Sequence, residues 1–128
     1  MVIKVGCKAS INEVVTDKNT AASVGSGSLQ VFATPAMIAL MEKASCLAIA
    51  DYLDEGSTSV GTMVNIEHLS ATPLGSTVNV ESVVTAVNGR QISFEVTASD
   101  NAGPIGKGTH DRFVVDAERF MTKANSKI

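Results

Sequence analysis

Aromatic residues are scarce in this 128-residue chain, which has no tryptophan, one tyrosine and four phenylalanines. A hydrophobic core must therefore be built mainly from aliphatic side chains, with the five methionines as flexible fillers. Hydrophobic residues make up 45% of the chain and charged residues only 18%, so we expect part of the surface to be covered in an oligomer. The length suits one domain, which we assign to residues 1–128.

Cysteine and positive charge are also sparse. Cys7 and Cys46 are the only cysteines, a pattern that argues against a structural zinc site or a disulfide scaffold. The net charge is −3 and there is no basic run, which argues against nucleic-acid binding. No apolar stretch approaches the roughly 20 residues that span a bilayer, and Lys4 and Lys8 interrupt the N-terminal segment. We therefore expect a cytoplasmic protein with no membrane anchor, signal peptide, metal or cofactor.

The first third of the chain predicts a strand, a lid and a helix. Residues 3–12 alternate apolar and polar side chains, as a half-buried strand does. Residues 16–28 are small and polar, which is typical of a loop or flexible lid. A helix is expected to begin at Thr34, interpreted as the N-cap, with Pro35 at the first helical position, and to end near Leu53.

Four further strands are predicted, separated by short turns. Asn88-Gly89 is expected to form the centre of a type I′ hairpin turn, and the tail from Lys123 is expected to be frayed. One helix packed on an antiparallel sheet is an α+β design. The expected strands span residues 58–69, 78–87, 91–99 and 105–115. Alternation is expected to place one set of side chains in each of two strands on the inward face: Val60, Thr62, Val64, Ile66 and His68 in the first, and Ile92, Phe94, Val96 and Ala98 in the third.

One carboxylate lies on the apolar side of the expected helix. At about 100° per residue, Glu42 lies near Ile38 and Ile49 and opposite Asp51. Burial without a partner raises the pKa of a carboxyl group, so such a residue needs either a structural hydrogen bond or a function.

Two other residues are candidates to act with Glu42. His68 is in phase with the apolar positions of its strand, so it is either a satisfied core histidine or the partner of Glu42. Thr34 precedes Glu42 by eight residues, and its hydroxyl either caps the helix or serves in the positive potential of the helix N-terminus. A hydroxyl, an imidazole and a carboxylate are the components of covalent acyl transfer.

Four stretches, in order along the chain, resemble the hotdog-fold thioesterases and most closely the fluoroacetyl-CoA thioesterase-like branch. The resemblance implies an α+β hotdog fold, in which a curved antiparallel sheet of about five strands wraps one long central helix. It also implies an acyl-CoA substrate bound at the interface of a homodimer or a dimer of dimers. The matching stretches are VFATPAMIALMEKA (31–44), VGTMVNIEHLSATPLGSTV (60–78), NGRQISFEV (88–96) and IGKGTHDRFVVDAERF (105–120).

The same resemblance implies roles for five residues. Thr34, Glu42 and His68 match the catalytic residues, while Gly61 and Arg112 match residues at the substrate. Arg112 has the alternative of pairing with an acid, and His110 on the same strand face matches no motif. The segment 19–30 has no aromatic residue, whereas the lid of the fluoroacetyl-specific enzyme carries phenylalanines. The resemblance therefore supports thioester hydrolysis better than it supports fluoroacetyl-CoA as substrate.

The expected function is the hydrolysis of a short or small acyl-CoA thioester to the free acid and CoA. Three routes stay open, in which Thr34 attacks the carbonyl, Thr34 positions the attacking water, or Glu42 forms a mixed anhydride. Two alternative functions also stay open, because fold alone does not decide function. One is a dimeric acyl-CoA-binding module without catalysis. The other is a hotdog hydratase or dehydratase, although such relatives typically use a different Asp/His arrangement.

Overall fold

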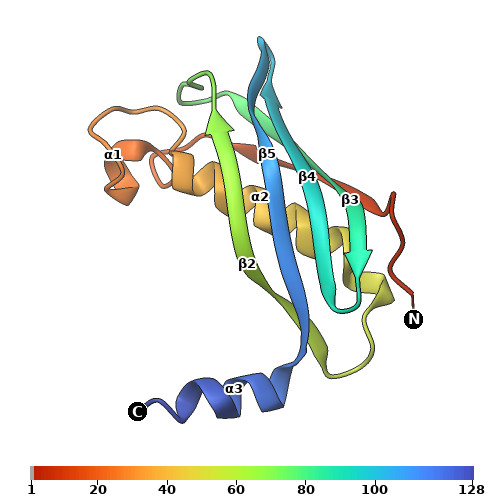
Figure 1. Cartoon of the computed structure of the whole chain (residues 1–128). Coiled ribbons are helices and arrows are strands. Elements are labelled where there is room, and N and C mark those ends of the chain that lie inside the picture. Colours follow the sequence, from red (N-terminus) through yellow and green to blue (C-terminus); the bar gives the residue numbers. More distant parts are fainter. Residues whose placement is uncertain (1) are drawn as a thin grey trace.

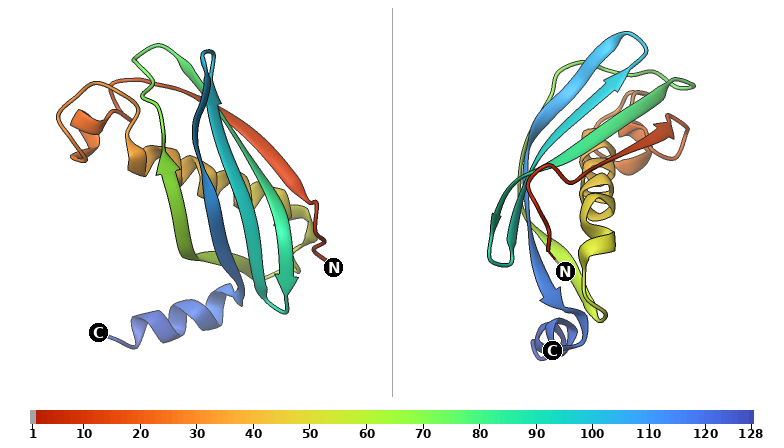
Figure 2. Two further views of the ribbon diagram at one scale, coloured as in Figure 1. Left: turned by 45° about the horizontal axis from the view of Figure 1, so that its top comes forward. Right: turned by 90° about the vertical axis from the view of Figure 1, so that its right-hand side faces the viewer.

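A five-stranded antiparallel sheet curves around one long helix in the computed structural model, which describes residues 2–128 (Figures 1 and 2). The strand order is β1-β3-β4-β5-β2, so β1 and β2 form the two edges of the sheet. Among residues 2–128, no helix is both long and apolar enough to cross a bilayer. The strands are β1 (Lys8–Val14), β2 (Ser57–His68), β3 (Thr77–Asn88), β4 (Gln91–Asp100) and β5 (Gly103–Asp116); the helices are α1 (Ala21–Val24), α2 (Thr34–Ile49), the short 3-10 helix η1 (Ala50–Tyr52) and α3 (Ala117–Asn125).

The core lies between α2 and the concave face of the sheet. The predicted alternation in β4 is confirmed, because Ile92, Phe94, Val96 and Ala98 are all buried. Burying one large apolar side chain contributes about 1.5–3 kcal/mol, so this aliphatic layer stabilises the fold without any tryptophan. The α2 side chains that complete the layer are Met37, Leu40, Met41, Ala44, Ala48 and Ile49.

Two fully buried hydroxyl groups join α2 to β3. The Ser45 hydroxyl donates to the carbonyl oxygen of Met41 at 2.8 Å, and the Ser45 and Ser82 oxygens are 2.7 Å apart. Because the Ser45 proton is already used, Ser82 donates to Ser45. Both hydroxyl groups are therefore satisfied, as buried polar groups must be.

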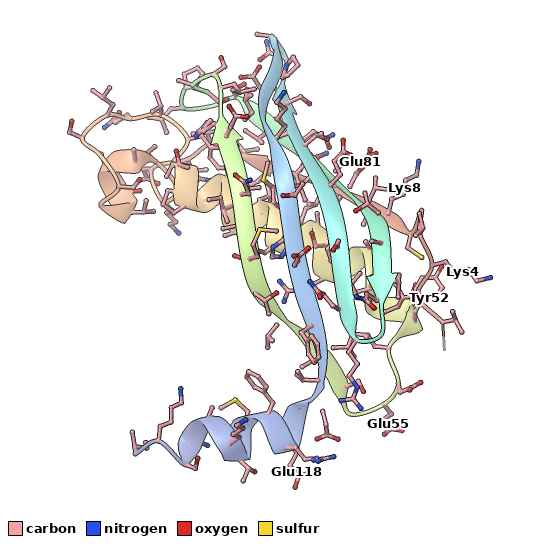
Figure 3. The ribbon with its side chains drawn as sticks, viewed as in Figure 1. Lys4, Lys8, Tyr52, Glu55, Glu81 and Glu118 are labelled. Carbon is pink, nitrogen blue, oxygen red and sulfur yellow. The ribbon has the colours of Figure 1, made fainter. Side chains whose placement is uncertain are left out.

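The N-terminal strand is shorter than predicted. It begins at Lys8 rather than near Ile3, because a turn precedes it in which the Cys7 amide donates to the Lys4 carbonyl at 3.1 Å. Gly6 has φ +98°, in the region that favours glycine, and Val5 is exposed. The segment before β1 passes beside η1, and Figure 3 shows Lys4 and Tyr52 at this end of the molecule.

The lid and the start of α2 also differ from the prediction. Residues 16–28 are not a plain loop, because Thr20 caps the short helix α1 by accepting from the Ser23 amide at 3.3 Å. Ala33, not Thr34, occupies the N-cap position of α2. Thr34 is therefore the first residue of the helix, and its hydroxyl is free of the capping role. The helix ends at Ile49 and continues as η1 to Tyr52.

The hairpin between β3 and β4 is confirmed, but its turn type is different. Asn88 pairs with Gln91, so the central residues are Gly89 and Arg90. Only Gly89 has positive φ, at 64°, which fits a type II′ turn with glycine first and not the predicted type I′ turn.

The tail from Lys123 was predicted to be frayed, but its first three residues, 123–125, form the end of helix α3. Asp116 caps this helix by accepting from the Arg119 amide at 3.0 Å, and α3 extends away from the sheet at the end of β5 (Figure 1). Sequence reasoning overlooked the capping signal of Asp116 just before an amphipathic run.

Candidate active site

A threonine and a histidine meet at the N-terminal end of α2. The Thr34 hydroxyl oxygen lies 2.7 Å from Nδ1 of His68, the last residue of β2. The helix places Thr34 there because Ala33 takes the N-cap position, and the sheet places His68 there because β2 ends beside the helix start. The distance is that of a good hydrogen bond between a hydroxyl and an imidazole nitrogen.

The surroundings of His68 favour the neutral form of its imidazole. Burial lowers the pKa of His68 below its usual 6.5, and the polar backbone at Ser70 opposes this shift. A neutral imidazole is the form that accepts a hydroxyl proton. The Nε2 atom of the ring is buried and has no hydrogen-bond partner within residues 2–128.

A cavity of about 270 Å³ opens beside this pair. It is bounded by Ala21 and Ser26 of the lid, by Val31 and Phe32 before α2, and by residues 69–71 after β2. A larger cavity of about 450 Å³ lies between η1 and the β3–β4 hairpin, and none of the five predicted site residues lines it. Thr34 and His68 both line the smaller cavity, so the smaller cavity is the one that belongs to the candidate site.

Glu42 and Arg112 form an ion pair farther along α2. Nη1 of Arg112 lies 3.4 Å from Oε2 of Glu42, and their side chains are 7% and 42% exposed, respectively. The sequence placed Glu42 on the apolar side of the helix or at its border, and the border is where it lies. The alternative that Arg112 pairs with an acid is also realised.

Gly61 provides the space for this ion pair. A Cβ atom at Gly61 would lie 2.9 Å from Glu42 Oε2 and 3.4 Å from Arg112 Nη1. A bulge between Gly61 and Met63 shifts the register of β2 against β5. The prediction that Val60 and Thr62 share the inward face with Val64 and His68 was therefore wrong, since a period of two does not continue through a bulge.

The five predicted residues form two groups within one chain. Thr34 and His68 make one pair, and Glu42, Arg112 and Gly61 make another cluster. At a rise of 1.5 Å per residue, Thr34 and Glu42 are about 12 Å apart along the helix axis. No hydrogen bond joins Glu42 to Thr34 or His68 within the described residues.

Two residues that sequence reasoning did not assign take part in the second cluster. Nε of Arg112 donates to the Ser59 hydroxyl at 2.8 Å, and Nη1 of Arg112 lies 3.2 Å from Nε2 of His110. The sequence offered one indication that His110 contacts Arg112: the two residues are two positions apart and therefore lie on the same face of one strand. Ser59 had no signal, because the bulge reverses the face assignment in β2.

Comparison with known proteins gives one concordant picture. The family model described as "Fluoroacetyl-CoA-specific thioesterase" matches residues 15–118. The fluoroacetyl-CoA thioesterase of Streptantibioticus cattleyicolor is 44% identical over 98 residues, which are 77% of this chain and 70% of that protein.

Solved structures agree in fold over nearly the whole chain. A structure of the fluoroacetyl-CoA thioesterase superposes with a TM-score of 0.93 at 36% identity, covering 100% of this chain and 99% of that one. A threonine-to-serine variant of that enzyme, in complex with acetyl-CoA, gives 0.92 at 37% identity over 98% of each chain. A thioesterase superfamily member from Thermus thermophilus gives 0.90 at 26% identity, covering 98% and 93%.

Proposed function

Because the chain belongs to the fluoroacetyl-CoA-specific thioesterase family, we propose that its Thr34, His68 and Glu42 carry out the hydrolysis of an acyl-CoA thioester. The hotdog fold and the activity of a thioester hydrolase follow from this membership. The observation that carries the assignment of residues is the 2.7 Å contact between the Thr34 hydroxyl and Nδ1 of His68.

In the first half of the reaction, Thr34 attacks the thioester carbonyl carbon. Its proton passes to Nδ1 of His68, and the carbonyl oxygen becomes an oxyanion. The backbone amides in the first turn of α2 lie at the positive end of the helix. The N-cap residue, Ala33, makes no side-chain hydrogen bond to these amides, so they are free to donate to the oxyanion. Each amide that donates to the oxyanion contributes about 3 kcal/mol to the transition state. The C–S bond then breaks, and the CoA thiolate takes the proton from His68.

In the second half, water hydrolyses the acyl-Thr34 ester. His68 takes a proton from the water as it attacks, and returns it to the Thr34 oxygen when the C–O bond breaks. The products are the free acid, CoA and the original hydroxyl. The route in which Glu42 forms a mixed anhydride is less well supported, since Glu42 is engaged by Arg112. The route in which Thr34 positions the attacking water uses the same contact between Thr34 and His68 and is the alternative to direct attack.

The acyl group is short. The cavity beside Thr34 is about 270 Å³ in one copy of the chain, which favours a small acyl group. The S. cattleyicolor relative is named for fluoroacetyl-CoA. Residues 19–30 here contain no aromatic side chain that could enclose so small a group. We therefore propose a short, non-fluorinated acyl-CoA as substrate.

The working unit is a homodimer, alone or within a dimer of dimers, formed along the free edge of β2. β2 is an edge strand of the sheet, and Met63 and Val64 at its middle are 39% and 46% exposed. Antiparallel pairing of two β2 strands about a two-fold axis near these residues is self-complementary. It brings His68 of one subunit beside the half of β2 that carries Gly61 of the partner subunit.

This pairing joins the two groups of site residues. Thr34 and His68 of one subunit would face Glu42 and Arg112 of the partner subunit, and the unpartnered Nε2 of His68 would find an acceptor there.

The free thiols of Cys7 and Cys46 fit a reducing, cytoplasmic setting.

Subunit mixing tests the shared site. Thr34→Ala and Glu42→Gln variants are each expected to release thiol from short acyl-CoAs far more slowly than the parent. After the two variants are mixed, unfolded and refolded together, half of the dimers are mixed and carry one intact site, so activity returns to about one quarter of the parent value. Absence of any recovery, with mixed dimers demonstrated by mass spectrometry, refutes the shared site.

A direct test addresses the nucleophile. Thr34→Ala with unchanged turnover would remove Thr34 from the chemistry, whereas an acyl adduct on Thr34, detected by mass spectrometry after acid quenching, would establish the covalent route.

A further inference from the structure

His110 is a buried histidine for which the reaction described above has no role. It is 1% exposed, and its ring stacks on Phe94 with centroids 6.0 Å apart and an interplanar angle of 27°. Nδ1 lies 2.7 Å from the carbonyl oxygen of Met63, and Nε2 lies 3.2 Å from Nη1 of Arg112. A carbonyl can only accept and a guanidinium can only donate. Nδ1 therefore carries the proton, and Nε2 accepts from Arg112.

The Arg112 guanidinium is held on three sides. Nε donates to the Ser59 hydroxyl at 2.8 Å, and Nη2 donates to the Ser59 carbonyl at 2.9 Å. Nη1 donates to His110 at 3.2 Å and to Glu42 at 3.4 Å. The contact with Glu42 is the longest of the four and is near the limit of a hydrogen bond. The direction of Nη1 is therefore set by Ser59 and His110, and not by Glu42.

We propose that His110 is a positioning residue of the thioesterase site, which holds Nη1 of Arg112 toward the Glu42 carboxylate. One N–H of Nη1 donates to Nε2 of His110. Because the guanidinium group is planar, the second N–H of Nη1 then points toward the Glu42 carboxylate. Phe94 and the Met63 carbonyl fix the imidazole itself. This inference rests on the proposed function, because it assumes that Glu42 and Arg112 belong to the site.

The His110→Phe variant isolates this role, because it keeps an aromatic ring on Phe94 and removes both ring nitrogens. We expect kcat to fall about tenfold, the usual effect of losing one hydrogen bond to a charged group, with less than a twofold change in KM. In an Arg112→Gln background the same change should alter kcat less than twofold, since there is no guanidinium left to position. Equal fold-losses in the two backgrounds would overturn the proposal.

A matched control separates positioning from loss of packing. Ile105→Val removes a buried methyl group on the same strand, so it should lower Tm while kcat stays within twofold of the parent. If Ile105→Val lowers kcat as much as His110→Phe does, the effect of His110 is structural and the proposal is wrong.

The tautomer of His110 provides a readout that needs no turnover. In ¹⁵N-labelled protein at pH 7.5, Nδ1 is expected to show the chemical shift of a protonated ring nitrogen, and Nε2 that of an unprotonated one. A proton on Nε2 would overturn the proposal even in an active enzyme. A parent protein that hydrolyses no acyl-CoA overturns the proposed function and the catalytic part of this inference, while leaving the tautomer result unchanged, so the two failures are distinguishable.

Discussion

Substitution of Gly61 by alanine tests whether the position of the Glu42 carboxylate matters for turnover. The added Cβ would lie 2.9 Å from Glu42 Oε2, 3.3 Å from His110 Cε1 and 3.4 Å from Arg112 Nη1. Gly61 is not among the glycines with positive φ, so alanine fits its backbone conformation. The contact with the end of the Glu42 side chain must change most, and the contact with the His110 ring needs only a small adjustment.

The size of the effect follows from these distances. An unstrained contact needs about 3.4 Å or more, so the carboxylate must retreat by roughly 0.5 Å. Because a misplacement of about 1 Å can lower the rate about 100-fold, we expect a decrease of kcat on the order of tenfold. The Glu42 side chain is 42% exposed and can move. Alanine also reduces the entropy of the unfolded chain, so the free energy of unfolding should change by less than about 1 kcal/mol.

Gly108→Ala is the matched contrast. Its Cβ would overlap the backbone carbonyl oxygen of Asn65 and lie 2.8 Å from the Ile66 Cα, and neither backbone atom can rotate away. This variant should lose several kcal/mol of stability, on the order of a severe overpacking. Initial rates of thiol release and urea unfolding curves on both variants measure the two effects. Gly61→Ala with parental kcat would refute the importance of the carboxylate position, and Gly61→Ala as unstable as Gly108→Ala would refute the geometric reasoning.

Four other outcomes are expected. Thr34→Ala should lower kcat at least 100-fold while Thr34→Ser stays within about tenfold of the parent, because only serine keeps the hydroxyl; equal losses in both variants would contradict this. The acid limb of kcat/KM should lie below pH 6.5, because burial lowers the pKa of His68 and the neutral ring is the base; an inflection above pH 6.5 in rates measured from pH 5 to 8 would show otherwise. The same shift means that the unfolded chain binds a proton more readily at His68, so its contribution to stability is complete above pH 6.5 and declines as the pH falls below that value, which thermal melts should show. Val64→Lys on the free edge should convert the dimer to monomer in sedimentation experiments and abolish turnover, and an active monomer would disprove the shared site.

The family and the central architecture were predictable from the sequence, and both predictions are confirmed. In β4 the alternation is undisturbed, so Ile92, Phe94, Val96 and Ala98 were correctly placed in the core. The helix was recognised because Pro35 and an apolar run define it. Local patterns of this kind are visible to sequence reasoning because neighbouring residues alone determine them.

Errors arose where a local pattern was overridden by pairing with a distant segment. The bulge after Gly61 depends on the register of β2 against β5, and no residue in β2 announces it. Residues 3–7 alternate as a strand does, but the Gly6 turn prevents them from extending β1.

The sequence named candidate site residues but not the contacts among them. Helix periodicity placed Glu42 at the edge of the apolar face, but its neighbour Arg112 is 70 residues away in the sequence. The contact between Thr34 and His68 spans 34 residues and depends on where the end of β2 lies relative to the start of α2. Whether the three residues act together stays a prediction, which the subunit-mixing experiment decides.

The paired hydroxyl groups of Ser45 and Ser82 give the helix a defined axial registration against the sheet. A slide of α2 by one turn would separate the two hydroxyl groups and leave the buried Ser82 hydroxyl without its partner, while Ser45 would keep its bond to the Met41 carbonyl within the helix. Thr34 and Glu42 both belong to α2. The contact between Ser45 and Ser82 in the middle of the core therefore fixes the axial position of both the proposed nucleophile and the carboxylate relative to the sheet. In a protein in which both serines are replaced by alanine, α2 would therefore be less fixed along its axis, and the Thr34 hydroxyl and the Glu42 carboxylate would both be held less precisely.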